Sequence, residues 1–218
     1  MYNKKMIAMM LTLSMLAASL AGCAGGDDDW DADKAASDVS VVWVESAWDP
    51  IIPNLNAGEM CDVIISAMTK TAERDEVIDF TAEYYPPSPS LYMALAGDSP
   101  TGAIAPQTNT IQAGYVAEAG GDLIEFSTPD ETIAAVKSGE ADAVLADGDY
   151  LVPIVAESGG MLEIVGDSVY IGGGVGMGVR ETDGDLKAAM DAAIEQMKSD
   201  GSLNALITKW FDAGSAVY

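Results

Sequence analysis

The sequence contains no histidine, only two cysteines and few basic residues. Without histidine, the chain lacks the side chain that most often acts as a general base and the one that most often binds zinc. Ten Lys and Arg residues stand against 35 Asp and Glu residues, so no basic patch is available to meet the phosphates of a nucleic acid. The composition therefore excludes nucleic acid as a partner, and we expect neither a metal nor another cofactor.

A long apolar run occurs only at the beginning of the chain. Two lysines precede an apolar core from Met6 to Leu20, and the sequence Leu20-Ala21-Gly22-Cys23 closes the segment. This order is typical of a secretory signal peptide, and its ending resembles a bacterial lipobox. We expect residues 1–23 to be a lipoprotein signal peptide and Cys23 to be the lipidated N-terminus of the mature protein. An ordinary signal peptide with an incidental cysteine is the alternative.

The predicted signal peptide places the mature protein outside the cytoplasm. We expect it to be exported and lipid-anchored to the outer face of the cell membrane or located in the periplasm. Residues 24–38 are rich in Gly and Asp and are interpreted as an acidic tether. With Cys23 in the anchor, Cys61 has no partner for an intramolecular disulfide, and we expect it to pack as a small core side chain.

Two segments of the chain share one pattern. The first runs from Asp49 to Ile65 and the second from Thr128 to Leu145. Each begins with a capping residue and a proline, and each continues for about two helical turns to a glycine that can end the helix. An acidic pair and an apolar run that predicts a buried strand then follow. The repetition predicts an α/β fold with two lobes, each with its own parallel sheet.

The lobes are expected to be discontinuous in sequence. Residues 90–95 and the glycine-rich residues 169–179 are interpreted as the two crossovers, because glycine supplies the backbone freedom that a hinge uses. Two ordinary, closely packed strands are the alternative. On the first interpretation, lobe 1 comprises residues 39–93 plus 180–218, and lobe 2 comprises residues 94–179.

Polar residues follow each of the two predicted strands. Thr69 and Arg74, one of only two arginines, come after Val63–Ile65, and Asp147 ends the strand of the second segment. Open α/β sheets bind ligands at the carboxyl ends of strands, and the planar guanidinium of arginine matches a carboxylate. A cation in one lobe and an anion in the other predict a cleft for a zwitterion with adjacent carboxylate and ammonium groups.

Two further features are candidates for the same site. Thr108 or Thr110 can cap a helix whose first N–H groups would add donors for the ligand carboxylate. A cap without any ligand role is the alternative. Trp48 precedes the first repeated segment and is interpreted either as a roof over the cleft or as ordinary packing.

Motifs from residue 41 to residue 213 together carry a family resemblance. They are Trp48–Pro53, Asp62–Ile65, Met68–Thr69 with Glu73–Arg74, Tyr84–Tyr85, Gln107–Gln112, Gly139–Asp147 and Ser199–Phe211. This set resembles the polar-amino-acid-binding proteins of ABC importers, solute-binding family 3. The resemblance implies a two-lobed type II periplasmic binding protein-like fold that closes on one amino acid. It also implies a monomer that delivers the amino acid to a membrane permease without catalysis.

The resemblance also implies roles for particular residues. In the family, the arginine of the motif holds the ligand α-carboxylate together with a threonine and a backbone group, and donors from a helix start join them. An aspartate binds the ammonium group, and an aromatic side chain walls the cleft. The ligand-binding residues implied in this way are Trp48, Ala67, Thr69, Arg74, Thr110, Ile111 and Asp147.

The sequence departs from the family pattern in three places, and one of them is Pro106, which removes a backbone donor in the strand before the helix start. Asn109 stands where glycine is usual, although Asn tolerates a left-handed conformation better than most residues. The opening strand, a ligand-contacting loop and most of the first helix are expected to be missing, with residues 30–36 as a remnant of the helix. Residues 39–44 then resume the pattern. We therefore expect an N-terminally shortened fold with an exposed sheet edge or apolar surface.

The preferred function is that of an exported substrate-binding lipoprotein for a polar or charged amino acid. A degenerate, non-binding paralogue that acts as a surface interaction protein is one alternative. A dehydratase similar to cyclohexadienyl dehydratase and a sensor input domain are two others. The absence of histidine and of a clustered acid–base pair argues against an enzyme.

Overall fold

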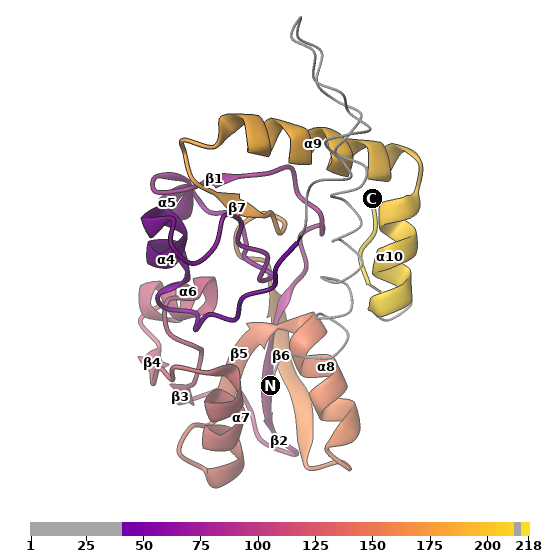
Figure 1. Cartoon of the computed structure of the whole chain (residues 1–218). Coiled ribbons are helices and arrows are strands. Elements are labelled where there is room, and N and C mark those ends of the chain that lie inside the picture. The colour runs from indigo at the N-terminus through magenta and orange to yellow at the C-terminus, as the bar shows by residue number, and fades with distance from the viewer. Residues whose placement is uncertain (1–40, 212–214) are drawn as a thin grey trace, which may run out of the picture. The chain divides into compact units, whose positions relative to one another are not determined.

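The computed structural model describes residues 41–211 and 215–218. The predicted signal peptide, Cys23, the acidic tether and the helix remnant at residues 30–36 lie outside the described residues. The rest divides into two compact units (Figure 1). Among the described residues, 87–172 form the central unit, and 41–86 together with 173–211 and 215–218 form the terminal unit. The fold class is α/β.

The central unit is built on a five-stranded sheet in the order β4-β3-β5-β2-β6. Its strands are β2 (Ser90–Leu95), β3 (Ala103–Ile104), β4 (Asp122–Leu123), β5 (Ala143–Asp147) and β6 (Leu162–Val169). β3 runs parallel to β4 and β5, whereas β2 is antiparallel to both β5 and β6. The prediction of an all-parallel sheet is wrong for this reason. β3, β4 and β5 are connected through helices, as parallel neighbours must be, but β2 brings the chain in from Pro87 and runs the opposite way.

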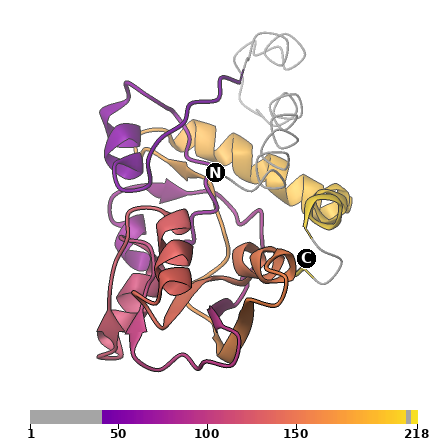
Figure 2. The ribbon, with the colours of Figure 1, turned by 90° about the horizontal axis from the view of Figure 1, so that it is seen from below.

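Helices cover both faces of this sheet (Figures 1 and 2). They are α6 (Ile111–Glu118), α7 (Pro129–Ser138) and α8 (Gly148–Glu157). Met93 and Val144 point to one face, where they pack with residues of α7 and α8 such as Val136 and Leu151. The next residue along each of the two strands points to the other face and packs with Val116 of α6. Side chains that alternate along β2 and β5 thus fill two separate cores.

The terminal unit has less regular strand structure among its described residues. β1 (Asp79–Phe80) pairs antiparallel with β7 (Gly178–Val179). The helices are α4 (Ile51–Ala57), α5 (Ala72–Asp75), α9 (Gly184–Ser199) and α10 (Ser202–Trp210). In both views α9 is the long helix that leads into α10. One apolar cluster joins α4 to β1, and a second joins β7 to α9 and α10.

The division into units differs from the lobe boundaries expected at 93/94 and 179/180. β2 lies wholly in the central unit, because it is hydrogen-bonded along its length to β5 and β6. β7 lies in the terminal unit, because its partner β1 is there. The chain therefore passes between the units at 86/87 and 172/173, before each of these strands begins.

The ends of α7 match the prediction, and those of α4 match it in part. Thr128 caps α7 and forms a capping box with Glu131, and Gly139 ends the helix with a φ of 75°. Gly58, with a φ of 68°, ends α4 in the same left-handed conformation. Pro50 rather than Asp49 is the N-cap of α4, and no side chain caps this end through a hydrogen bond.

The strand predicted at Val63–Ile65 does not form, and the segment that resumes the family pattern is irregular where the structure describes it. The run Val63–Ile65 contributes a single bridge, in which the backbone of Ile64 pairs with Gly178. Residues 41–44 are irregular, and their four large apolar side chains are 43–78% exposed. A strand requires a neighbour for its N–H and C=O groups, and no residue described in the structure pairs with 41–44 as a strand. The exposed apolar surface expected from the departures in the sequence is present here.

No helix in the described part of the chain combines the length and the apolar character needed to cross a membrane.

Candidate functional site

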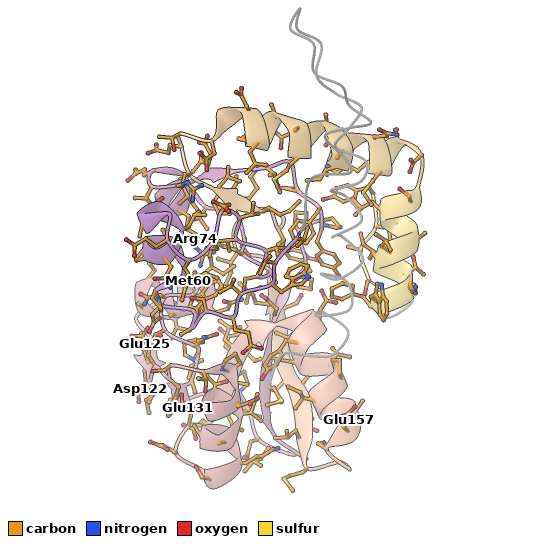
Figure 3. The ribbon with its side chains drawn as sticks, viewed as in Figure 1. Met60, Arg74, Asp122, Glu125, Glu131 and Glu157 are labelled. Carbon is orange, nitrogen blue, oxygen red and sulfur yellow. The ribbon has the colours of Figure 1, made fainter. Side chains whose placement is uncertain are left out.

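Arg74, labelled in Figure 3, lies in the short helix α5. Contacts with neighbouring residues orient its side chain. Thr71 is the N-cap of α5, and its hydroxyl accepts a hydrogen bond of 3.3 Å from the backbone N–H of Arg74. The guanidinium Nη1 donates to the backbone carbonyl of Thr69 at 2.8 Å. The guanidinium carbon also lies 5.3 Å from the centroid of the Trp48 ring, within the range of a cation–π contact. Both contacts hold the guanidinium in a defined orientation.

The segment before α5 is fixed by backbone pairing with the glycine-rich chain. Thr69 forms an antiparallel bridge with Val175, and the N–H of Lys70 donates to the carbonyl of Gly174 at 3.1 Å. Ala67 has a φ of 50°, which is uncommon for a residue with a side chain. A hydrogen bond joins the backbone of Ala67 to the hydroxyl of buried Tyr84, and burial raises the pKa of that hydroxyl. The segment thus holds Thr69 and Arg74 on a defined backbone.

Asp147 occupies the position that the sequence predicts, at the carboxyl end of β5. It pairs with Ser90 across the β2–β5 ladder and is the N-cap residue of α8. Its side chain makes no capping hydrogen bond to α8. Instead, Oδ1 accepts a hydrogen bond of 2.7 Å from Nε2 of Gln112 in the first turn of α6. The carboxylate is therefore held by a side chain from another element rather than by the helix that it precedes.

The start of α6 contains the other predicted residues of the central unit. Thr110, and not Thr108, is the N-cap: its hydroxyl accepts from the N–H of Ala113 at 3.3 Å and donates to the carbonyl of Gln107 at 2.6 Å. Ile111 is the first helical residue. Asn109 has a φ of 56°, so the left-handed conformation expected at this position is confirmed.

The second arginine of the chain has a structural role in the terminal unit. The guanidinium of Arg180 binds Asp62 and Asp183, each at 2.8 Å, and donates to the carbonyls of Leu55 and Cys61. The hydrogen bond to Asp62 is the main reason why the pKa of the Arg180 guanidinium is raised. Cys61 is a free, partly buried thiol that packs beside the α4 cluster, and burial raises its pKa. Arg180 thus ties the end of α4 to the beginning of α9.

The predicted residues form one set in each unit. In the terminal unit, Arg74 contacts both Thr69 and Trp48, and Ala67 lies in the same segment. In the central unit, Asp147 is joined to α6, the helix that Thr110 caps, through Gln112. Gln112 was not among the site residues predicted from the sequence; its place two residues after the capping threonine was the available signal. Within residues 41–211 and 215–218, no group of His, Cys, Asp or Glu side chains is arranged to hold a metal ion.

Comparisons with known proteins agree on one family. Residues 28–213 match the model of the bacterial extracellular solute-binding proteins, family 3. The chain is 53% identical to a solved periplasmic His/Glu/Gln/Arg/opine family-binding protein from Silicibacter pomeroyi in complex with lysine. That match covers 96% of this chain and 89% of the other, with a TM-score of 0.85.

Curated relatives give the same result at greater distance. The chain is 29% identical over 191 residues to the L-arginine-binding protein of Pseudomonas aeruginosa, a match that covers 79% of this chain and 73% of the relative. It is also 29% identical over 197 residues to the lysine/arginine/ornithine-binding periplasmic protein of Escherichia coli. That match covers 80% of this chain and 73% of the relative.

Proposed function

This chain belongs to the bacterial extracellular solute-binding proteins, family 3, and on that premise we propose that it captures one basic amino acid for an ABC importer. The family and the relatives establish an amino-acid-binding protein of the periplasmic type. Lysine and arginine are the proposed ligands. The observation that carries this choice is the 53% identity to a protein solved with lysine, supported by two relatives named for arginine or for lysine, arginine and ornithine.

The proposed ligand contacts in the terminal unit centre on Arg74. Its guanidinium would bind the α-carboxylate, assisted by Thr69 and the backbone of Ala67. The carbonyl of Thr69 and the ring of Trp48 support this role, because they hold the guanidinium in a defined orientation. A charge-assisted, bidentate contact is the arrangement in which arginine binds a carboxylate most strongly. Trp48 would also form an aromatic wall of the site.

The proposed contacts in the central unit centre on Asp147. Its carboxylate would bind the α-ammonium group, and the start of α6 at Thr110 and Ile111 would add donors for the ligand carboxylate. The hydroxyl of Thr110 is engaged as the helix cap, so the backbone is the part of Thr110 proposed to contact the ligand. A ligand that met both Arg74 and Asp147 would gain one charge-assisted contact from each unit.

Export and delivery complete the proposal. The lipobox-like end of the predicted signal peptide at Cys23 supports a lipid anchor that keeps the mature protein at the membrane. From there, a monomer would pass its amino acid to a membrane permease. Metabolic labelling of the lipid gives a direct check. When a strain that expresses the full chain is fed a labelled fatty acid, the wild-type protein should become labelled and the Cys23→Ala variant should not.

A thermal-shift screen of the mature protein against the amino acids tests the binding proposal. A ligand that binds only the folded form raises the unfolding temperature by mass action, so lysine or arginine should give the largest shift. Arg74→Ala and Asp147→Ala should each remove most of the shift. Glu73→Ala is the matched control, because Glu73 is the residue before Arg74 in the same helix and its side chain is exposed to solvent.

Two results would contradict the proposal. No shift with any amino acid would favour the non-binding paralogue. Equal tolerance of the Arg74, Asp147 and Glu73 substitutions would show that the ligand binds elsewhere.

A further inference from the structure

We propose that Gln112 is a positioning residue that holds the Asp147 carboxylate for the ligand ammonium group. This inference rests on the proposed function, because it assigns Gln112 a part in the same site. Gln112 does not contact the ligand in this proposal. It acts through Asp147, which it meets from a different helix.

The contact joins three elements of the central unit. Nε2 of Gln112, in α6, donates to Oδ1 of Asp147 at 2.7 Å and to Oγ of Ser90, in β2, at 3.0 Å. Gln112 is 5% exposed and Ser90 is 2% exposed. Since an amide nitrogen has two protons, these two bonds use both of them. The side-chain amide is thus fixed at a buried position, with one proton directed at the carboxylate.

The chemistry of the donor suits a carboxylate that has to bind a cation. A lysine or arginine at this position would neutralise Asp147, whereas an uncharged amide orients the carboxylate and leaves its charge in place. Hydrogen bonds to a charged group are about twice as strong as those between neutral groups. Gln112 can therefore fix the direction of Asp147 without competing electrostatically with an ammonium group.

The position of Asp147 at a helix N-cap gives such a restraint a purpose. An aspartate at a helix N-cap commonly turns its side chain back to accept from the backbone N–H groups of the first turn. Asp147 is the N-cap of α8, yet it makes no such bond. The bond from Gln112 offers its carboxylate an alternative partner away from the α8 backbone. Removal of Gln112 takes away one contact that orients the Asp147 carboxylate, so the amides of α8 should compete more strongly with the ligand for it.

A double-mutant cycle on the mature protein tests this role, with lysine as the probe and calorimetric titration as the measurement. Gln112→Met keeps the length of the side chain and removes the donor, and we expect it to weaken lysine binding about ten- to hundredfold. In an Asp147→Asn background the same substitution should cost less than about threefold, since the group that it positions is no longer a carboxylate. Gln196→Met, at an exposed position in α9 of the terminal unit, is the matched control and should leave the affinity unchanged.

A second ligand separates positioning from a general structural role. 6-Aminohexanoic acid is lysine without its α-amino group, so it retains the carboxylate and lacks the cation proposed for Asp147. Gln112→Met should weaken lysine and leave 6-aminohexanoic acid within about twofold of its wild-type affinity. If Gln112→Met does not fold, Gln112→Asn keeps the amide and withdraws it from reach, and the same pair of ligands applies.

The outcomes distinguish the two proposals. Wild-type protein that binds neither lysine nor arginine overturns the proposed function and this inference together. Wild-type protein that binds lysine, with additive effects of Gln112→Met and Asp147→Asn or equal losses for both ligands, overturns the inference alone. Non-additive effects restricted to lysine support it.

Discussion

The two units hold their candidate ligand residues in different ways. In the central unit, Asp147 ends a strand that is hydrogen-bonded to β2 on one side and to β3 on the other. In the terminal unit, Arg74 lies in a four-residue helix after a segment held by single bridges. The negative charge is therefore part of a continuous sheet, whereas the positive charge depends on a capping threonine and a few local contacts. We infer that Asp147 is held more rigidly within its unit than Arg74 is within its own.

The largest effect expected in this comparison comes from removing the positive charge of the terminal unit. Arg74→Ala should weaken lysine binding at least about a hundredfold, because a charge-assisted contact with the carboxylate is lost. Its unfolding temperature should stay close to that of the wild type. Titration calorimetry and thermal unfolding of the same variant measure the two effects.

Arg180→Ala is the control for that prediction, because it removes the other arginine of the same unit. Arg180 binds two carboxylates and two carbonyls, so its loss should lower the free energy of unfolding by about 2 kcal/mol. Its affinity for lysine should change less than about threefold. A variant pair with the opposite pattern would show that Arg74 is structural and Arg180 is the ligand residue.

Within the residues that the structure describes, the central unit has a five-stranded sheet and the terminal unit a two-stranded one. This difference predicts that a cavity in the core lowers the free energy of unfolding more in the central unit than in the terminal unit. Met93 in β2 and Met68 in the cluster that joins α4 to β1 are fully buried, at 0% and 1% exposure. Methionine-to-alanine substitutions in cores cost about 2–5 kcal/mol, and less where the surroundings can collapse into the space. We expect the loss of unfolding free energy to lie near the upper end of this range for Met93→Ala and near the lower end for Met68→Ala. Chemical denaturation measures both losses. Equal costs would mean that the terminal unit packs as firmly as the central one.

The central unit also contains a tyrosine, Tyr150, whose ionisation should lower the free energy of unfolding at alkaline pH. Burial, with a contribution from Asp130, raises the pKa of Tyr150 to about 12. A tyrosine in the unfolded chain ionises near pH 10, so the unfolded state loses this proton first as the pH rises. The stabilisation is complete below about pH 10 and is lost between about pH 10 and 12.

Replacement of Tyr150 should remove that loss. In Tyr150→Phe, the decrease in unfolding free energy from about pH 9 to about pH 11 should be smaller than in the wild type by about 1 kcal/mol, allowing for partial exposure of the ring. Denaturation curves at the two pH values measure it. Tyr170, which is 70% exposed, provides the control, and Tyr170→Phe should follow the wild type. A Tyr150→Phe curve that also follows the wild type would refute the assignment.

The smallest effects concern one left-handed residue in each unit. Ala67→Gly, in the terminal unit, should raise the free energy of unfolding by about 0.5–1 kcal/mol, because glycine adopts a positive φ without the steric cost that alanine bears. Asn109→Gly, in the central unit, should change it by only a few tenths, since asparagine tolerates this conformation better. Thermal unfolding of both variants makes the comparison, and a destabilised Ala67→Gly would contradict the backbone assigned there.

The sequence predicted the central unit better than the terminal one. The capped helix α7, its stop at Gly139 and the strand that ends at Asp147 follow from local signals, namely a capping box, a proline and an apolar run. The strand expected at Val63–Ile65 depended on partners far away in sequence, and only Ile64 found one among the described residues. Local pattern specifies a helix end, but a strand also needs a neighbour.

The candidate site divides in the same way. Arg74, Asp147 and the cap at Thr110 were predicted from strand ends, a family motif and the capping preference of threonine. The bond between Gln112 and Asp147 was not, because α6 and β5 are brought together by packing over a sheet whose strand order the sequence did not reveal. The contact between Trp48 and Arg74 is equally non-local.

A crystal structure of the mature protein grown with lysine tests the central claim most directly. The account predicts one lysine with its α-carboxylate in hydrogen-bond contact with the guanidinium of Arg74 and its α-ammonium group in contact with the carboxylate of Asp147. A bound lysine whose charged groups meet other residues would contradict it.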